Sequence, residues 1–274
     1  MTTTLRPLEP LQQHPDGTRS RRYQVCVNSR PVGAVHLATH PVFGPSVARL
    51  LDLRIEEPDR RRGRGTVAAL AAEEVARDWG CKRIEASVPA DAGAAVRLVT
   101  ALGYVQRNCG MEKQLGPSAP ELPPGTRGRA LTDAEYGPWL EQGKAGYAQS
   151  WIDRGVPPEQ AWAKSEDDHA RLLPQGPATP GMLLSVLEHE GTPVGTLWLA
   201  VADDKAFVYD VEADARFRGR GHGRSLMLLA ERQALAAGRR VLGLNVFAGN
   251  TPAERLYASL GYEPVLYAMY KELL

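Results

Sequence analysis

The sequence predicts two tandem α/β (α+β) domains, each a mixed, mostly antiparallel sheet flanked by helices. Two observations lead to this fold class. The second half reads in order as helix, helix, three strands, helix, strand, helix and strand, which is typical of a sheet covered by helices. The chain also contains an internal repeat, and its 274 residues suffice for two modest domains.

The repeat joins two stretches that are rich in arginine and glycine and are each followed by a Leu-Gly-Tyr sequence. Arg218 lies 156 positions after Arg62 in the alignment of the two stretches. Three later pairs share an offset of 158: Gly103 with Gly261, Met111 with Met269, and Lys113 with Lys271. Ordered matches at a nearly constant offset indicate duplication, and a two-copy repeat of this length indicates tandem domains.

Apolar periodicity and turn residues set the elements of the second half. The predicted helices cover 133–155, 156–173, 224–238 and 251–261; three strands lie within 182–213, joined at 190–192 and 203–204, and two more cover 241–247 and 265–273. Prolines near the starts of two helices and glycines at the ends of two fit this division.

A segment rich in Pro and Gly separates the two copies. Residues 116–129 have few apolar side chains and predict an extended, semi-rigid linker. The expected domains are therefore 1–115 and 130–274.

Composition narrows the functional classes. Hydrophobic residues make up 43% and charged residues 24%, which is ordinary for a globular protein in water, and the net charge of +1 favours neither nucleic acid nor an acidic membrane as a partner. Three cysteines without metal-type spacing fit free thiols in a reducing cytoplasm, and no metal site is expected. Neither a signal peptide nor a transmembrane helix is visible.

The informative chemistry lies where a strand ending near Ala213 runs into a glycine-rich turn that opens a helix. Such a turn points several backbone N–H groups and the positive end of a helix at one place, and glycine lets a diphosphate approach closely. A dinucleotide-binding turn is excluded because the preceding strands form hairpins, not a βαβ unit. A Walker loop is excluded because no Gly-Lys-Ser/Thr follows.

Two motifs in this half resemble the GNAT superfamily of acetyltransferases. The first is the family's Arg/Gln-x-x-Gly-x-Gly/Ala signature, here Arg218-Gly219-Arg220-Gly221-His222-Gly223. The second runs from Asn250 through Ala253, Leu256 and Tyr257 to Gly261 and Tyr262. The resemblance covers residues 126–274 well and 20–115 more faintly, and it implies a degenerate, truncated first domain and a catalytic second one.

The resemblance implies acetyl-CoA as co-substrate and gives roles to single residues. Backbone groups of Val211 and Ala213 would bind the pantetheine arm and the acyl carbonyl, and Asn250 would contact the same arm. The diphosphate would lie in the turn made by Arg218, Gly219, Arg220, Gly221, His222, Gly223 and Arg224. Tyr257 would protonate the departing CoA thiolate, which suits a phenol with a pKa near 10.

The general base is less specified by the sequence. The family's glutamate position on the strand after the long helix reads here as Asn245, which is a poor proton acceptor. Asp210 and Glu212 on the preceding strand share one face, because side chains alternate along a strand. Glu212 is the predicted base, directly or through a water, and an amine that arrives neutral needs no strong base.

Structural roles compete with several of these assignments. Tyr257 also fits a core tyrosine, Asn250 a helix cap, and Glu212 a salt-bridge partner. Arg218 and Arg220 are expected to face solvent. His222 is expected on the surface of the turn. Four aromatic residues of the first two helices fit either a core or an acceptor cleft: Trp139, Tyr147, Trp151 and Trp162.

The first copy departs from the motifs where chemistry is expected. Alignment from Arg62 places Val67 at the position of Gly223, and the offset of 158 places Ala92 and Val99 at the positions of Asn250 and Tyr257. About thirty residues precede the Pro-Val-Gly sequence at 31–33, too few for two acceptor-flanking helices. A structural role is expected for this half, and weak CoA binding remains open because the turn glycines at 63 and 65 are kept.

The sequence therefore predicts an N-acetyltransferase that moves an acetyl group from acetyl-CoA to a primary amine by direct attack in a ternary complex. A non-catalytic acyl-CoA sensor and an acyltransferase with a longer acyl donor are the alternatives. The acceptor is a small-molecule or peptide amine of unspecified identity, and a homodimer is left open.

Overall fold

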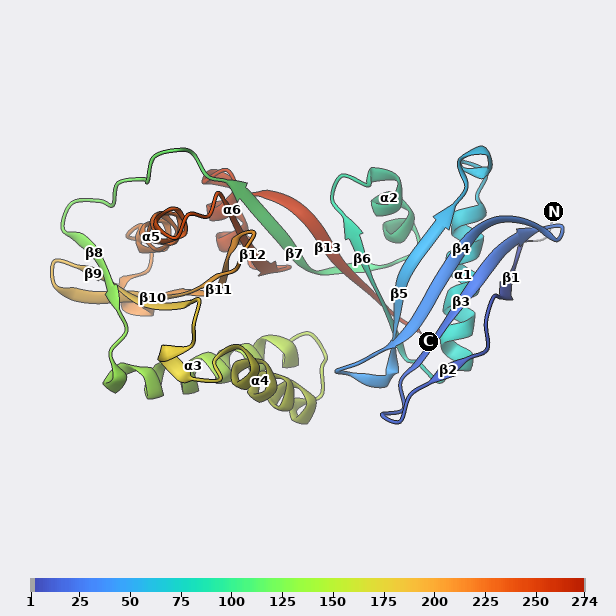
Figure 1. Ribbon diagram of the computed structural model, residues 1–274, viewed down its shortest axis with the longest axis horizontal. Helices are drawn as coiled ribbons and strands as arrows, with labels where there is room; N and C mark the ends of the chain where they lie inside the picture. Colours follow the sequence, from blue (N-terminus) through green and yellow to red (C-terminus); the bar gives the residue numbers. More distant parts are fainter. Residues whose placement is uncertain (1–2, 274) are drawn as a thin grey trace. The chain divides into compact units, whose positions relative to one another are not determined.

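The computed structural model describes residues 3–273 and divides into two compact units (Figure 1). Unit 1 comprises the chain up to Cys109 together with the C-terminal segment from Val265. Unit 2 comprises Gly110–Pro264. The predicted two-part organisation and fold class are thus present, but the C-terminal segment belongs to the first unit and not, as predicted, to the second.

Unit 1 is built on a sheet with the strand order β1-β3-β4-β5-β6-β13 and on two helices. Its elements are β1 (Thr3–Pro7), β2 (Gln12–Gln13), β3 (Arg19–Val27), β4 (Arg30–His40), β5 (Gly44–Ile55), α1 (Arg64–Asp78), β6 (Arg83–Pro89), α2 (Gly93–Ala101) and β13 (Glu263–Glu272). All its pairings are antiparallel except that of β5 with β6.

Unit 2 is built on a sheet with the strand order β7-β12-β11-β10-β9-β8 and on four helices. Its elements are β7 (Val105–Gln114), β8 (Thr126–Ala130), α3 (Asp133–Ile152), α4 (Pro158–Leu172), β9 (Met182–His189), β10 (Thr192–Val201), β11 (Ala206–Ala213), α5 (His222–Ala236), β12 (Val241–Phe247) and α6 (Thr251–Ser259). The helices and strands predicted for residues 133–273 are all present, and β7 and β8 are the strands of unit 2 that the sequence did not indicate.

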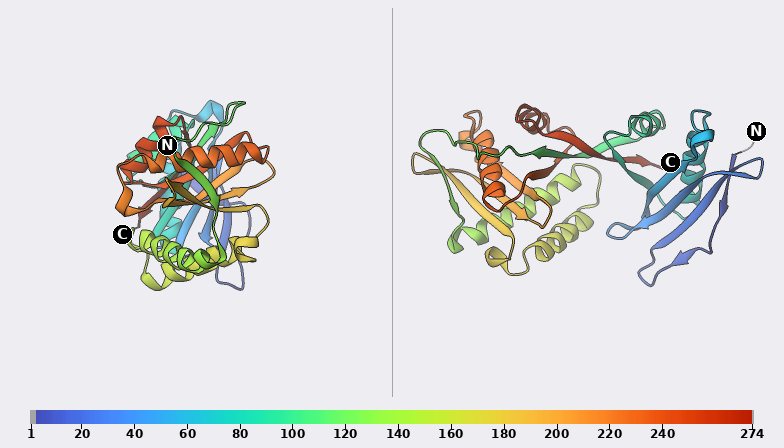
Figure 2. Two further views of the ribbon diagram at one scale, coloured as in Figure 1. Left: turned by 90° about the vertical axis from the view of Figure 1, so that its left-hand side faces the viewer. Right: turned by 45° about the horizontal axis from the view of Figure 1, so that its top comes forward.

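Helices cover both faces of the sheet in unit 2 (Figures 1 and 2). Leu226 of α5 lies against Gly195 of β10 on one face. Trp198, on the opposite face of the same strand because its position differs by an odd number of residues, stacks edge-to-face on Trp139 of α3 at 5.7 Å between ring centroids. Side chains of β10 and β11 that share the face of Trp198 therefore point toward α3 and α4.

The two units exchange their last strands. Residues of β7 that follow Cys109 belong to unit 2, whereas β13 pairs antiparallel with β6 and brings Met269 and Leu273 into the core of unit 1. The equivalent residues 158 positions earlier, Met111 and Leu115, are buried in unit 2.

A buried ion pair fixes each exchanged strand. Lys271 donates to Glu73 at 2.7 Å in unit 1, and Lys113 donates to Glu231 at 2.7 Å in unit 2. The two lysines and the two glutamates are each 158 positions apart, so each lysine pairs with the glutamate of the other copy. A tyrosine completes both sites: the hydroxyl of Tyr262 donates to Glu231, and burial together with the Glu73 carboxylate raises the pKa of Tyr104.

The exchange corrects the predicted domain boundaries of 1–115 and 130–274. The C-terminal segment from Val265 belongs to the first unit, and residues 110–129 to the second. Part of the predicted linker is β8, which pairs with β9 from Thr126 onward. The linker composition hid this short edge strand, because arginine and glycine are not typical of strands. Within the described residues, no helix combines the length and apolar character needed to cross a bilayer.

We expect Lys271→Ala to destabilise unit 1 by about 3 kcal/mol, because it leaves the Glu73 carboxylate, 1% exposed, buried without its partner. Urea unfolding measures the loss, and amide hydrogen exchange locates it in α1; Lys113→Ala should act in the same way on α5. Lys205→Ala is the control, since its pair with Glu112 is partly exposed and is worth less than about 1 kcal/mol. Equal losses for Lys271→Ala and Lys205→Ala would contradict the role of the buried pair.

Candidate active site

The site begins at the C-terminal half of β11, where the direction of the backbone groups can be worked out. The amide of Asp214 donates to the carbonyl of Val194, so this position faces β10. Backbone groups alternate between the two edges of a strand. The N–H and C=O groups of Val211 and Ala213 therefore face the edge away from β10, as their predicted role in binding the pantetheine arm requires.

On that edge, β11 pairs with the parallel strand β12 over a short distance. The pairing covers Ala206–Val208 with Leu242–Leu244. A bulge at Tyr209 shifts the register between β10 and β11 at this point, since Trp198 is opposite Asp210 whereas Leu199 is opposite Val208. Bulges redirect strands and end their pairing. The backbone N–H and C=O groups of β11 after the bulge are thus available to hydrogen-bond a ligand.

The turn between β11 and α5 presents backbone amides. Gly219 and Gly221 have φ angles of 77° and 85°, in the left-handed region that glycine adopts without a steric penalty. Gly221 is the N-cap of α5, and no side chain caps this helix. The N–H groups of the first helical turn, from His222 to Arg224, therefore have no acceptor within the helix and carry its positive dipole end.

A third glycine brings the turn close to α6. A Cβ placed on Gly223 would lie 3.3 Å from the side chain of Leu256, tighter than most real contacts. The Arg224 guanidinium also donates to the hydroxyl of Ser259 at 2.6 Å. These contacts hold the helix that carries Tyr257 beside the amide-lined turn.

The arginines of the turn lie in solvent, as expected. Arg218 and Arg220 are exposed, and the Arg220 guanidinium lies 5.7 Å from the centre of the Phe217 ring. Arg216 is paired with Asp214 and is engaged within the turn itself. Positive charge is therefore available around the amides from exposed side chains.

His222 differs from the prediction of a surface residue. Its side chain is buried and packs against His189, with 5.4 Å between ring centroids, and against Phe217. Burial, then His189 and Arg220, lower the pKa of His222. The side chain of His222, the first residue of α5, therefore points inward and packs beneath the turn as a neutral ring. Its backbone N–H remains at the start of the helix.

Tyr257 on α6 has its hydroxyl free of protein partners. The side chain is 6% exposed, and within residues 3–273 its hydroxyl has no hydrogen-bond partner. Burial, then the charge of Asp210, raise the pKa of Tyr257 to about 12. The phenol therefore stays protonated at neutral pH. Asn250 caps α6, since its Oδ1 accepts from the amide of Ala253 at 3.3 Å, so the capping interpretation describes one of its contacts.

Two carboxylates of β11 point toward α3 and α4. Asp210 is opposite Trp198, and Glu212 is opposite Thr196. Burial, then the charge of Glu212, raise the pKa of Asp210 to about 6. Glu212 is exposed and accepts from the side-chain amide of Gln142 at 3.0 Å. In the sequence analysis both Asp210 and Glu212 were candidate bases, and Glu212 was the predicted one. The bulge that precedes Asp210 could not be predicted from the residue types.

Aromatic rings fill the face between these carboxylates and the two helices. Trp139 and Trp151 contact Trp198 and Phe247, respectively, and Tyr147 donates to Asp168. Trp162 is 44% exposed and belongs to none of these ring contacts. Three of the four aromatic residues therefore pack against other rings, whereas Trp162 is exposed, and the choice between core and acceptor cleft stays open.

Unit 1 corrects the alignment of the repeat. Gly63 is the left-handed N-cap of α1, as Gly221 is of α5, and the two lie 158 positions apart. Gly65 therefore matches Gly223, and Val67 does not occupy that position; the offset of 156 from Arg62 was wrong. Gly65 even meets Leu98 of α2 as Gly223 meets Leu256. The first copy keeps the glycines at 63 and 65 but has Arg61, with a φ angle of 59°, at the position of Gly219.

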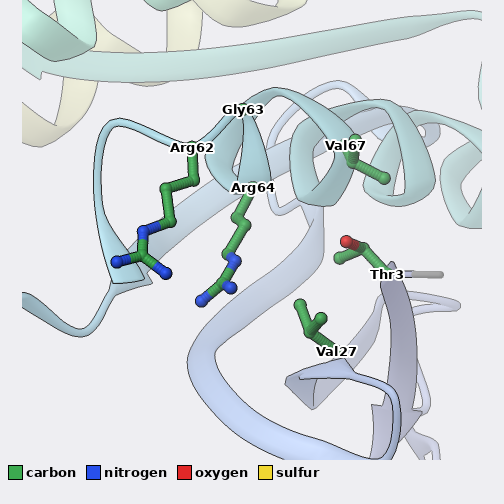
Figure 3. A pocket seen from close by; sticks show the side chains of 6 residues that line it. All are labelled: Thr3, Val27, Arg62, Gly63, Arg64 and Val67. Carbon is green, nitrogen blue, oxygen red and sulfur yellow. The ribbon is translucent and has the colours of Figure 1, made fainter. Parts of the chain in front are cut away.

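The turn of unit 1 has other differences. A pocket beside it is lined by Thr3, Val27, Arg62, Gly63, Arg64 and Val67 (Figure 3). Arg64, at the position of His222, forms a buried ion pair with Asp59, which also binds Arg30. Residues 3–27 form strands, not the two helices that precede the hairpin in unit 2.

At the positions of Asn250 and Tyr257, unit 1 has Ala92 as the N-cap of α2 and Val99 buried on that helix. These side chains offer no proton and no polar contact. The groups with acid–base chemistry therefore gather in unit 2.

Comparison with known proteins agrees with this geometry. The model of the acetyltransferase (GNAT) family matches residues 3–104 and 145–262. An uncharacterized N-acetyltransferase, YycN of Bacillus subtilis, is 31% identical over 145 residues, which are 51% of this chain and 93% of that protein. A mycothiol acetyltransferase of Thermobispora bispora is 34% identical over 212 residues, covering 73% of this chain and 68% of that protein.

Solved structures share the tandem fold. A GCN5-related N-acetyltransferase from Sphaerobacter thermophilus aligns with a TM-score of 0.60 and 20% identity, over 92% of this chain and 80% of that one. A tandem GNAT protein from the clavulanic acid biosynthesis pathway aligns with a TM-score of 0.50 and 20% identity, over 96% and 85%. Since the family model matches both halves of the sequence, the chain belongs to the acetyltransferase (GNAT) family, in a tandem arrangement.

Proposed function

We propose that unit 2 transfers an acetyl group from acetyl-CoA to a primary amine. One observation carries this proposal: Tyr257, a buried side chain whose hydroxyl has no hydrogen-bond partner within residues 3–273, lies on the helix that packs against an uncapped, glycine-lined helix start. The equivalent place in unit 1 has the turn but has Val99 in place of the tyrosine. Family membership makes an acetyl donor the natural ligand for the turn.

The chain has groups that fit each part of the donor. The amides from Gly219 to Arg224 suit a diphosphate, because glycine lets the oxygens approach and the helix dipole favours negative charge. The outward-facing backbone groups of Val211 and Ala213 suit the amide-containing pantetheine arm. Asn250, at the start of α6, can donate from its side-chain NH2 group to the same arm, since its Oδ1 already accepts from Ala253.

The reaction that we propose is direct attack of the amine on the thioester carbonyl. The new C–N bond forms, the C–S bond breaks, and the sulfur takes the proton of the Tyr257 hydroxyl. The proton lost by the amine goes to a carboxylate of β11, and the tyrosine regains its proton from solvent. Backbone N–H donors that face the developing oxyanion contribute about 3 kcal/mol each in comparable sites.

We favour Asp210 over Glu212 as the base. A base works best with a pKa near the operating pH, and the pKa of Asp210 is raised to about 6. The charge of Asp210 also contributes to the raised pKa of Tyr257, so the proposed proton acceptor is electrostatically coupled to the proposed proton donor. Glu212 is exposed and bonded to Gln142, which suits a role in binding.

A sensor that binds acyl-CoA without reacting is the rival from another class. Such a protein has no use for a free buried phenol beside a carboxylate of raised pKa, and so these two groups favour the enzyme. A longer acyl donor stays as an alternative for the same chemistry. Unit 1 acts as a structural partner in this proposal, and the three free cysteines support a reducing, cytoplasmic setting.

We expect Tyr257→Phe to lower kcat at least about tenfold, because the thiolate loses its proton donor. CoA affinity, measured by calorimetry, should change little, since the hydroxyl engages no protein group and the ring is kept. Tyr23→Phe in unit 1 is the matched control and should keep full turnover. Unchanged turnover in Tyr257→Phe would remove the proton-donor role.

We expect Asp210→Asn to lower kcat with a monoamine by about a hundredfold, because the amide cannot accept the amine's proton. Glu212→Gln should lower it much less. The measurement is CoA thiol release under saturating acetyl-CoA. A larger loss in Glu212→Gln would return the base to the residue that the sequence pattern favours.

Asp210→Asn should also stabilise the protein at neutral pH. The pKa of Asp210 is raised from 3.8 to about 6 on folding, so the folded state holds the proton more tightly than the unfolded state. Its ionisation therefore costs stability as the pH rises through this window, and the cost is absent below pH 3.8.

We expect a gain of about 1 to 2 kcal/mol for the asparagine variant at pH 7.5. The gain should shrink toward zero near pH 4 in urea unfolding. Asp204→Asn, at an exposed position, is the control with no gain. A variant that is less stable than the wild type at pH 7.5 would contradict the assigned burial cost.

A further inference from the structure

We propose that unit 1 holds a separate reactive site, away from its glycine turn, in which the Ser20 hydroxyl attacks small activated carboxylic esters and His36 takes its proton. Three features carry the proposal: a hydrogen bond between these two side chains, a carboxylate without a partner opposite the imidazole, and an unpaired guanidinium on its other side. The proposal is independent of the chemistry of unit 2, because every group belongs to β3, β4 or β5.

The groups of this site share one face of the unit 1 sheet. β4 lies between β3 and β5 (Figure 1), and His36 of β4 is opposite Arg22 of β3 and Asp52 of β5. The start of α1 approaches Leu53 and Ile55 of β5. Side chains alternate along a strand, so Asp52 points to the face away from α1. Within residues 3–273, unit 1 has no counterpart of α3 and α4, the helices that cover the corresponding face in unit 2.

Ser20 and His36 have the geometry of a nucleophile and its base. The Oγ of Ser20 lies 2.9 Å from Nε2 of His36, and both side chains are half-buried, so a small molecule can reach the hydroxyl. Burial, then the charge of Arg22, lower the pKa of His36, and the ring is therefore neutral at neutral pH. A serine hydroxyl is a weak nucleophile by itself and is activated by a neutral imidazole within hydrogen-bond reach.

Asp52 supplies the group that orients the base. Opposite residues of antiparallel strands have Cβ atoms about 5 Å apart, so the exposed carboxylate reaches the imidazole of His36 by rotating about its own side-chain bonds. Within residues 3–273 this carboxylate has neither a hydrogen bond nor an ion pair. Because Nε2 of His36 is engaged by Ser20, Nδ1 is the nitrogen that donates to a carboxylate. Such a bond favours the tautomer in which Nε2 accepts the serine proton.

Arg22 lies on the side of the imidazole where negative charge develops. It is two residues from Ser20 along β3, on the same face, and it is exposed. Glu9 accepts from its backbone amide at 3.2 Å, whereas the guanidinium has no partner in the described part of the chain. When Ser20 attacks an ester, charge grows on the carbonyl oxygen, and a cation at this place stabilises it.

The reaction needs water as its one co-reactant. The bond from Ser20 Oγ to the carbonyl carbon forms while Nε2 of His36 takes the hydroxyl proton. The bond to the leaving oxygen then breaks, and this oxygen takes the proton from His36. Water next attacks the acyl-serine, with His36 again as base, and the acid leaves as Ser20 regains its proton. Because the hydroxyl lies on a half-exposed sheet surface, we assign the site to small esters with a good leaving group.

The test is covalent labelling of the full chain with diisopropyl fluorophosphate, which phosphorylates activated serines, and hydrolysis of 4-nitrophenyl acetate. Peptide mass spectrometry should locate the label on Ser20, and Ser20→Ala should lose both label and catalysed hydrolysis. His36→Gln should lower both rates about a hundredfold, the contribution of a positioned base, and Asp52→Asn at least about tenfold. Ser87→Ala and His14→Gln, at exposed positions of unit 1, are the matched controls and should keep both rates.

Urea unfolding of each variant shows that unit 1 remains folded, so that a lost label reports chemistry. A label on Ser20 that is lost in His36→Gln and kept in Ser87→Ala, with hydrolysis above the Ser20→Ala background, would support the proposal. A wild-type label on another residue, or none, would overturn it. Equal rates in the wild type and His36→Gln would also overturn it, because the bond between the two side chains would then be only structural. Labelling of Ser20 without hydrolysis above that background would overturn the hydrolytic step and with it the proposal.

Discussion

The site in unit 2 depends on the short parallel pairing of β11 with β12. Three residues of each strand pair, and the pairing stops at Val208, directly before the bulge at Tyr209 in the pairing of β11 with β10. Buried backbone groups must find partners, so the unpaired edge after the bulge needs a ligand or solvent. This one constraint supplies the amide groups for the donor, turns Asp210 and Glu212 toward α3 and α4, and leads the chain into the glycine turn of α5.

Each unit of the duplicated chain contains a strand that comes from the other copy. Each exchanged strand carries a lysine to a glutamate that is almost completely buried, and the pairs Lys271–Glu73 and Lys113–Glu231 are equivalent by the repeat. A buried carboxylate without a cation is costly, so neither unit can release its borrowed strand cheaply. Unit 1 therefore has a structural role even without the side chains of the proposed acetyltransferase chemistry. It contains β13, the last strand of the chain, and β7, which follows α2, completes unit 2.

Much of this could be predicted from residue patterns, and the rest depends on contacts that patterns do not contain. Periodicity and turn residues located the helices and strands of the second half, and the two motifs located the turn and Tyr257. The partner of β13 could not be predicted, because a strand carries the same alternation whichever sheet it joins. The repeat did align Lys113 with Lys271. The sequence analysis did not use this match to predict the buried glutamates with which the two lysines pair. The burial of His222 and the bulge before Asp210 arise from tertiary packing, and the misaligned Val67 came from matching Arg62 to Arg218 before the glycines.

The central claim is that unit 2, through the amides of its glycine turn, presents a thioester to Tyr257. A crystal structure of the full chain with acetyl-CoA tests it most directly. The account predicts diphosphate oxygens within hydrogen-bond distance of the N–H groups of His222, Gly223 and Arg224, with the sulfur beside the Tyr257 hydroxyl. Donor bound at Gly63 of unit 1 alone, or a sulfur remote from Tyr257, would contradict it.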